Sequence, residues 1–201
     1  MNTENRQNIL DAALQAILEN GYHESIDDIA TRAGVARQTI YNHFSGRDAL
    51  LAETVSRMAE GVRISLDDKS SDLRSALLRF AAAYREKMLG DIGISLYRIV
   101  LSDAGRYPSL SQARAVFAAN LSETRQRLAV TLGRAMAMGT LRRDDPEFAS
   151  DVFLGMLNGA EQLRGLFYAE LPADITPERD GRVVDCFLRA FRDEYKSLVR
   201  R

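Results

Sequence analysis

Polar side chains with the chemistry of nucleic-acid contacts are concentrated between residues 25 and 47 of this chain. The candidate contact residues are Ser25, Arg37, Gln38, Thr39, Tyr41, Asn42, His43 and Arg47. Gln38 has the paired donor and acceptor that match adenine, and Arg37 matches guanine or a phosphate. This set therefore indicates direct reading of base edges in double-stranded DNA.

Other members of the set favour the DNA backbone. Thr39 suits either a thymine methyl group or a phosphate. Tyr41 and His43 are predicted phosphate donors, because half or more of protein–DNA hydrogen bonds go to the backbone. Arg47 begins the next helix and fits a phosphate clamp. Two alternatives stay open: Tyr41 is a core residue with its hydroxyl at the surface, or His43 merely occupies a solvent-facing position.

A first short helix is expected directly before these residues. Ser25 precedes an apolar pattern of Ile26, Ile29 and Ala30. Its hydroxyl suits an N-cap, and the acidic residues that follow lie where the helix dipole favours them. Gly34 then suits a left-handed turn that ends this helix.

A second short helix begins near Arg37. Ile40 and Phe44 lie four residues apart and face inward, which directs the polar residues outward or to the flanks. Such a helix enters the major groove and presents its N-terminal residues to base edges. The two helices together predict a helix-turn-helix.

The run DDIATRAGVARQTIYNHFSGRDALL resembles the DNA-binding signature of the TetR family of bacterial transcriptional regulators. The shared positions are Ile29-Ala30, Ala33-Gly34-Val35, Thr39-Ile40-Tyr41, His43-Phe44 and Arg47. The resemblance is specific because several unusual residues keep their relative spacing at once. Residues 9–26 also fit the first helix of that family.

Two positions depart from the family pattern. Ala36 stands where Ser or Thr is usual, so a helix cap and a phosphate contact are missing; the loss of a cap to Ala typically costs about 0.5–2 kcal/mol. Arg47 replaces the commoner Lys, which keeps the charge and changes the contact geometry.

The chain of 201 residues is long enough for a small head and a larger body. We expect an all-α fold of about nine helices, with a helix-turn-helix DNA-binding domain over residues 1–50 and a regulatory and dimerisation domain over residues 51–201. A helix that begins at Arg47 is expected to continue to about residue 66. Further helices are predicted over residues 73–89, 92–104, 110–138, 146–168 and 177–199.

Residues 93–110 resemble the AefR-like subgroup of TetR C-terminal domains. The matching residues are Leu96-Tyr97-Arg98, Asp103-Ala104 and Tyr107-Pro108, with Asp103 where Glu is commoner. This resemblance implies a type of C-terminal domain and names no ligand.

The last two helices are the predicted dimer interface. Gly155 and Gly159 leave one helix face flat, and the final helix has an apolar face too broad for a solvated helix. The predicted interface residues are Phe148, Val152, Gly155, Gly159, Leu163, Val184, Phe187, Leu188 and Phe191. The alternative is that this face packs within the monomer. A two-fold dimer predicts an inverted-repeat operator with half-sites roughly 34–36 Å apart.

A ligand pocket is expected among the middle helices. Its candidate lining residues are Tyr84, Met88, Tyr97, Phe117, Leu121, Met136, Phe153, Met156 and Gln162. Adaptable Met side chains and few charges suit an apolar or aromatic small molecule. The alternative is that each of them is an ordinary core residue. The lone Cys186, beside Phe187 and Leu188, is expected to be a buried structural thiol.

Composition argues against an enzyme. With two His and one Cys, and without a glycine-rich nucleotide loop or a nucleophile elbow, we expect no catalytic site, no metal site and no cofactor. The absence of a signal peptide or a spanning apolar run predicts a cytoplasmic protein that is not bound to a membrane.

The charge of the N-terminal part is unusual for a DNA-binding domain. The net charge of the chain is −1, and its first 60 residues hold at least as many acids as bases. The acids Asp11, Glu19, Glu24, Asp27 and Asp28 are therefore expected to lie away from DNA. Few phosphates would be neutralised, so the salt dependence of binding should be shallow.

These features predict a homodimeric repressor that a small apolar or aromatic effector releases from an inverted-repeat operator. The alternative is a DNA-binding dimer without an effector, which acts through protein partners.

Overall fold

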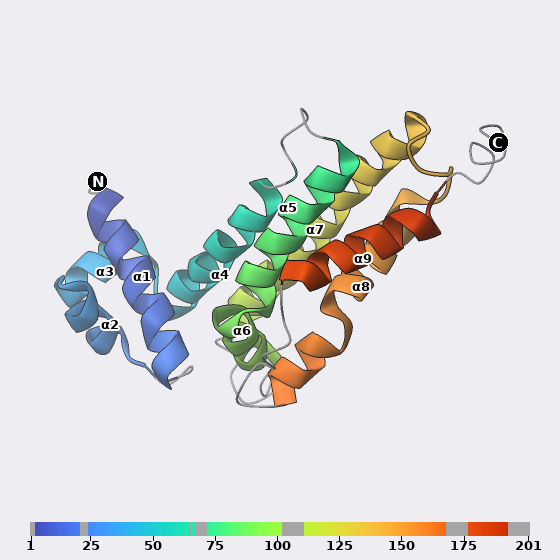
Figure 1. Cartoon of the computed structure of the whole chain (residues 1–201). Helices are drawn as coiled ribbons and strands as arrows, with labels where there is room; N and C mark the ends of the chain where they lie inside the picture. The colour runs from blue at the N-terminus through green and yellow to red at the C-terminus, as the bar shows by residue number, and fades with distance from the viewer. Residues whose placement is uncertain are drawn as a thin grey trace, which may run out of the picture.

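The computed structural model describes residues 3–20, 24–64, 66, 72–101, 111–167 and 177–192. Every regular element in these ranges is a helix, which confirms the predicted all-α class (Figure 1). A head of three helices lies at one end, the larger helical body lies at the other, and α4 runs between them. No helix within the described ranges is long and apolar enough to cross a membrane.

The head consists of α1 (Thr3–Asn20), α2 (Ile26–Ala33) and α3 (Arg37–His43). The apolar faces of these helices enclose a single core. Its buried members include Ile9, Leu10, Ala13, Ile29, Ile40, Phe44 and Leu50. Because α3 is only seven residues long, this core rather than helix propensity must hold it in place.

Helix α4 (Arg47–Ile64) belongs to both parts of the molecule. Leu50 in its first turn is buried in the core of the head. Leu51, Val55 and Val62 are buried in the core of the body. Since close-packed interiors transmit strain, a shift of α4 against the body displaces the head as well.

The body consists of α5 (Leu73–Tyr84), the π-helical segment η2 (Arg85–Leu89), α6 (Asp91–Leu101), α7 (Ser111–Ala137), α8 (Pro146–Phe167) and α9 (Pro177–Ala190). The predicted helix over residues 73–89 is thus divided into α5 and η2. The predicted helix over 177–199 ends earlier, at Ala190. Asp103, Ala104, Tyr107 and Pro108 of the AefR-like pattern lie outside the described residues.

Aromatic rings join α5, α8 and α9 in the core of the body. The Phe153 ring centre lies 6.1 Å from that of Phe80 and 4.9 Å from that of Phe187. Phe187 in turn stacks on Phe191, with 4.6 Å between centres. Val184 and Phe187 are 0% exposed, and Phe191 is 3% exposed. Their prediction as dimer-interface residues is therefore wrong, because they have almost no surface left to bury against a second chain.

Cys186 is exposed, contrary to the prediction of a buried thiol. The core-facing apolar residues here are Val184 and Phe187 of α9 and Phe191 just after it, which are three and four positions apart. One residue along a helix turns the side chain by about 100°, so Cys186 points away from the ring of Phe187 that follows it.

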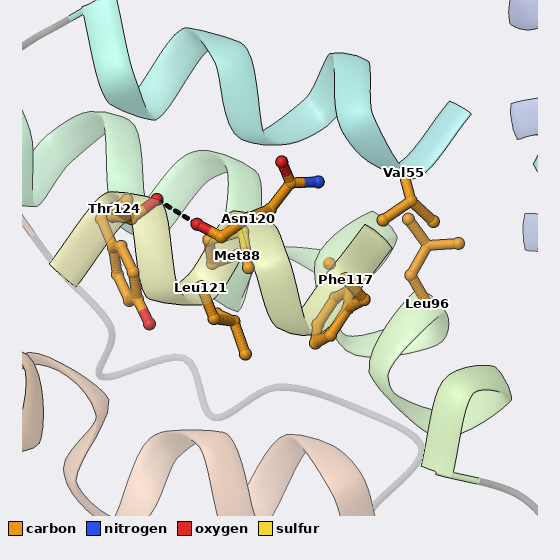
Figure 2. A pocket seen from close by; sticks show the side chains of 9 residues that line it. Val55, Met88, Leu96, Phe117, Asn120, Leu121 and Thr124 are labelled. Carbon is orange, nitrogen blue, oxygen red and sulfur yellow. Dashed lines mark hydrogen bonds between the residues drawn. The ribbon is translucent and has the colours of Figure 1, made fainter. Parts of the chain in front are cut away.

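Helices α4, α5, α6 and α7 and the π-helical segment η2 surround a small cavity in the body (Figure 2). Its lining residues are Val55, Tyr84, Met88, Gly93, Leu96, Phe117, Asn120, Leu121 and Thr124. The cavity measures about 20 Å³, which is room for about one water molecule. Gly93 allows α6 to approach η2, because a Cβ atom there would clash with the carbonyl group of Met88.

A buried ionic cluster joins η2, α8 and α9. The Arg85 guanidinium donates to Glu161 Oε2 at 2.6 Å and to Asp180 Oδ1 at 2.8 Å. Arg179 forms a second ion pair with Glu161, whose side chain is 1% exposed. Glu161 lies two residues after the kink of α8 at Gly159, where φ is +45° and ψ is −143°. The cluster therefore holds the second half of the bent helix against the π-helical segment.

Replacement of Glu161 by Gln should destabilise the protein strongly. The largely buried Arg85 and the partly exposed Arg179 would each lose a carboxylate partner, so we expect a loss of about 3 kcal/mol in the free energy of unfolding. Urea unfolding at one fixed protein concentration measures this loss. Glu147→Gln is the matched control, because Glu147 pairs with Arg125 and its side chain is 63% exposed; we expect a loss below about 1 kcal/mol there. Equal losses in the two variants would contradict a structural role for the cluster.

Candidate nucleic-acid interface

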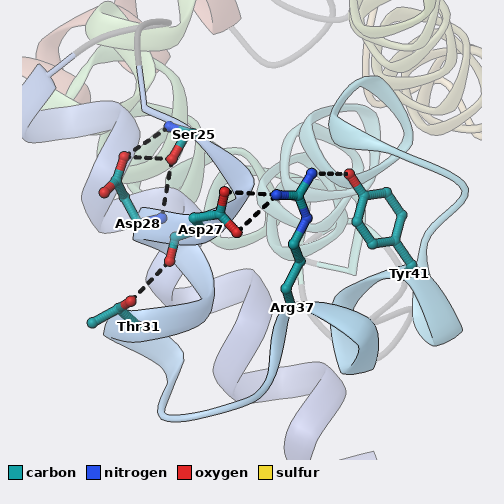
Figure 3. Close-up of polar contacts among 6 residues, drawn as sticks. All are labelled: Ser25, Asp27, Asp28, Thr31, Arg37 and Tyr41. Carbon is teal, nitrogen blue, oxygen red and sulfur yellow. Dashed lines mark hydrogen bonds and ion pairs between the residues drawn. The ribbon is translucent and has the colours of Figure 1, made fainter.

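Ser25 caps α2 as the sequence predicts. Its Oγ accepts the Asp28 backbone N–H at 3.1 Å, and its own backbone N–H donates to the Asp28 carboxylate at 3.2 Å (Figure 3). These hydrogen bonds from Ser25 also lower the pKa of the Asp28 carboxyl from its ordinary value. The Ser25 hydroxyl is therefore used inside the head, and its contact with DNA stays a prediction.

The turn between α2 and α3 is a left-handed cap. Gly34 has φ +67° and ψ +31°, which glycine adopts readily, and this confirms the predicted turn. The Val35 N–H donates to the Ala30 carbonyl at 3.0 Å, which closes the turn. Ala36 then begins α3 without a side-chain cap, as its departure from the family pattern predicts.

Helix α3 is anchored by one side and exposed on the other. Ile40 is 0% exposed and Phe44 is 4% exposed, which confirms their predicted inward orientation. Exposed members of the predicted contact set are Ser25, Arg37, Gln38, Tyr41 and Asn42, and half-buried members are Thr39, His43 and Arg47. The side chain of Tyr41 is 41% exposed. The outer face of α3 thus presents a polar surface at the end of the molecule.

Two members of the contact set have restricted geometry. The Nε2 atom of Gln38 donates to Asn42 Oδ1 at 3.2 Å, so these two amides are coupled along the helix. The Nδ1 atom of His43 is buried and has no hydrogen-bond partner among the described residues. A phosphate contact of His43 must therefore use its other ring nitrogen, Nε2.

Arg37 is held by two neighbours (Figure 3). Its Nη1 donates to both carboxylate oxygens of Asp27, at 2.8 and 3.1 Å, and its Nη2 donates to the Tyr41 hydroxyl at 3.4 Å. The hydrogen bond to Tyr41 and the charge of Asp27 raise the pKa of Arg37 from its ordinary value. The Asp27 carboxylate thus lies against Arg37, the first residue of α3, and the expectation that Asp27 lies away from DNA stays a prediction.

The body cavity contains part of the predicted ligand pocket. Tyr84, Met88, Phe117 and Leu121 line it, as predicted. Tyr97 lies just behind, with its ring edge-on to Phe117 and 4.6 Å between centres. Burial raises the pKa of Tyr97, and its hydroxyl interacts with Tyr84 and Gln162 rather than with the cavity.

Three further pocket candidates lie elsewhere. Met136 and Phe153 are buried in the general core of the body, as the alternative interpretation has it. Met156 lines an open groove beside α9. Val55, Leu96, Asn120 and Thr124 also line the cavity, and they were not predicted from the sequence as pocket residues. The sequence could have indicated the two α7 residues, because Asn120 and Thr124 lie three residues after Phe117 and Leu121 and therefore share their helix face.

The outer side of α8 carries exposed apolar side chains. Phe148, Leu163 and Phe167 are 53%, 58% and 82% exposed, and Gly155 and Gly159 are exposed between them. Val152 on the same helix and Leu188 on α9 are half-buried. These residues are the part of the predicted dimer interface that has surface available to a second chain.

Comparisons with known proteins agree with this geometry. Residues 9–54 match the family described as bacterial regulatory proteins of the tetR family, and residues 75–197 match the C-terminal domain of AefR-like transcriptional repressors. The chain is 36% identical over 85 residues to the transcriptional activator FasR of Mycolicibacterium smegmatis, a match that covers 38% of this chain and 39% of FasR. It is 39% identical over 64 residues to the fatty acid metabolism regulator protein of Bacillus subtilis, covering 27% of this chain and 33% of that protein. The matched segments thus span well under half of either relative.

Solved structures share the whole fold. A TetR-family regulator from Mesorhizobium loti aligns with a TM-score of 0.77 at 21% identity, over 95% of this chain and 97% of that one. The flavonoid-responsive regulator FrrA aligns with a TM-score of 0.66 at 29% identity, over 94% and 97%. The fatty acid degradation regulator FadR from Bacillus halodurans aligns with a TM-score of 0.70 at 20% identity, over 92% and 99%.

The family matches cover both the head and most of the body, and they agree with the cap, turn and polar face of the helix-turn-helix. The chain therefore belongs to the TetR family of transcriptional regulators, with an AefR-like C-terminal domain, and it is a DNA-binding regulator rather than an enzyme.

Proposed function

We propose that the protein is a homodimeric repressor that binds an inverted-repeat operator through α3 and leaves it when an apolar or aromatic effector enters the body. The outer face of α3 carries this proposal. Its exposed Arg37, Gln38 and Asn42 lie where a recognition helix contacts bases, while Ile40 and Phe44 fix the helix in the head. The description of the C-terminal family as transcriptional repressors supports repression, whereas the relative FasR is named an activator.

The exposed apolar stripe of α8 supports a dimer. Phe148, Leu163 and Phe167 lie on the same helix as the exposed Gly155, where open space permits close approach of a second helix. A two-fold axis there would present two α3 helices to successive turns of DNA, roughly 34–36 Å apart. The operator would then repeat the symmetry of the dimer.

Helix α4 gives the effector a route to the head. Val55 lines the body cavity, and Leu50 lies five residues earlier in the core of the head. A ligand that widens the cavity against Val55 would move α4 and change the separation of the two heads. Release requires that the ligand bind the DNA-free conformation more tightly, by several kcal/mol for a nearly complete switch.

The apolar lining of the cavity defines the class of effector. Leu96, Phe117 and Leu121 offer contacts to an acyl chain or an aromatic ring. Relatives named for fatty acid metabolism and for flavonoids support this range of chemistry. Because the cavity measures about 20 Å³, such a ligand must displace the flexible Met88 or open η2.

A second candidate function follows from this small volume. A closed core favours a DNA-binding dimer without an effector, which acts through protein partners. In that case the body serves only to pair and space the heads.

Substitutions in α3 should separate base recognition from backbone contacts. Selection of duplexes from a random-sequence library would give the preferred site of the wild-type protein. Gln38→Ala should change the preferred bases, because its amide matches adenine, and mismatched contacts cost about 1–3 kcal/mol each. His43→Ala should weaken binding to all sequences alike, because a phosphate contact carries no base information. An unchanged base preference in Gln38→Ala would refute the assignment of Gln38 to base readout.

A charge placed in the α8 stripe should split the dimer. Leu163→Glu would put a carboxylate into an apolar interface, so we expect the molar mass in light scattering to fall from that of two chains to that of one. Val130→Glu is the matched control, because Val130 is similarly exposed, at 53%, but lies on α7 outside the stripe. A Leu163→Glu protein that stays dimeric would place the interface elsewhere.

A further inference from the structure

The ion pair between Asp27 and Arg37 crosses from α2 to α3 at the surface that meets DNA (Figure 3). Both side chains are open to solvent, with exposed fractions of 58% for Arg37 and 59% for Asp27. Arg37 is the sole Lys or Arg of α3. The carboxylate therefore offsets the one permanent positive charge that the recognition helix carries.

Other acids of the head have different roles. Asp28 completes the cap with Ser25. Glu19 pairs with Arg32, and Asp11 pairs with Arg57, so neither contacts α3. Among these acids, Asp27 alone holds a residue that the recognition helix would use to contact DNA.

The geometry of the pair conflicts with base reading through the Nη1–Nη2 edge of Arg37. Paired recognition of guanine requires two N–H groups of one guanidinium edge. Asp27 occupies Nη1 through both of its oxygens, and the Tyr41 hydroxyl occupies Nη2. The Nη1–Nη2 edge is thus filled in the free protein, and a phosphate at the same edge would meet the Asp27 carboxylate as a like charge.

We propose that Asp27 is a negative determinant of DNA affinity, which holds Arg37 in the free head and must release it when DNA binds. This inference rests on α3 being the DNA-contacting helix, as proposed above. Tyr41 supports the guanidinium from its other side, with 5.6 Å from the guanidinium carbon to the ring centre. Because Arg37 must leave Asp27 before it contacts DNA, it contributes less to the binding free energy. Fewer counterions are then released from the DNA phosphates.

The test is Asp27→Asn, measured with the duplex that the wild-type protein selects and with a scrambled duplex of the same composition. Exposed ion pairs of this kind change an equilibrium about 1.4- to 5-fold, so two heads should gain about 2- to 25-fold in affinity. The gain should appear on both duplexes. The log–log salt slope should steepen by about two for the dimer, since one more positive charge per head becomes available to phosphates.

A double-mutant cycle shows whether Asp27 acts through Arg37. In an Arg37→Ala background, Asp27→Asn should change affinity less than about 1.5-fold, because the residue that it restrains is gone. Asp11→Asn is the matched control for net charge, since it removes the same charge from the head at a pair that does not involve α3. It should leave affinity and salt slope close to those of the wild-type protein.

Four results would overturn the inference. A lower affinity of Asp27→Asn would mean that Asp27 positions Arg37 for DNA. An equal gain with and without Arg37 would mean direct repulsion between Asp27 and phosphates, and an equal gain in Asp11→Asn would mean a general charge effect. If Gln38→Ala and Arg37→Ala each lose DNA binding while Asp27→Asn binds with wild-type affinity, α3 remains the DNA-contacting helix. Only the role of Asp27 is then rejected.

Discussion

Helix α4 is the element on which the rest of the structure depends, because it is packed into two cores at once. Leu50 is buried among the head residues, and Leu51 begins the buried series that continues through Val55 into the body. Two consecutive residues of one helix are thus packed in the cores of different domains. The head cannot rotate freely about this junction, and its orientation is set by the packing of α4 along the body.

The head has little charge with which to bind DNA, so geometry has to supply much of its affinity. Its ion pairs join Asp27 to Arg37 and Glu19 to Arg32, which neutralises cations that phosphates would otherwise attract. A protein of this kind gains from holding two heads at the spacing of two half-sites, since the second contact is then favoured by effective concentration. In the dimer proposed above, a modest displacement of α4 would therefore be sufficient to weaken DNA binding.

Local features of the head could be predicted from the sequence, because they depend on neighbours within a few residues. The Ser25 cap, the left-handed Gly34 and the inward Ile40 are of this kind. Tertiary features could not be predicted from the sequence, because they depend on how distant elements pack together. The apolar face of α9 is equally broad whether it meets its own core or a partner, and only the packing of Phe187 on Phe153 decides. The pair of Asp27 with a residue ten positions away depends on the angle between two helices.

The coupling of the cavity to the heads through α4 is the central claim, and the distance between the two heads tests it most directly. Spin labels at Ser45→Cys, in a Cys186→Ser background, report this distance in the free dimer by pulsed electron paramagnetic resonance. Val55→Phe adds bulk where α4 meets the cavity, so the account predicts a shift of several ångströms in the distance together with weaker operator binding. An unchanged distance distribution in a folded Val55→Phe dimer would contradict it.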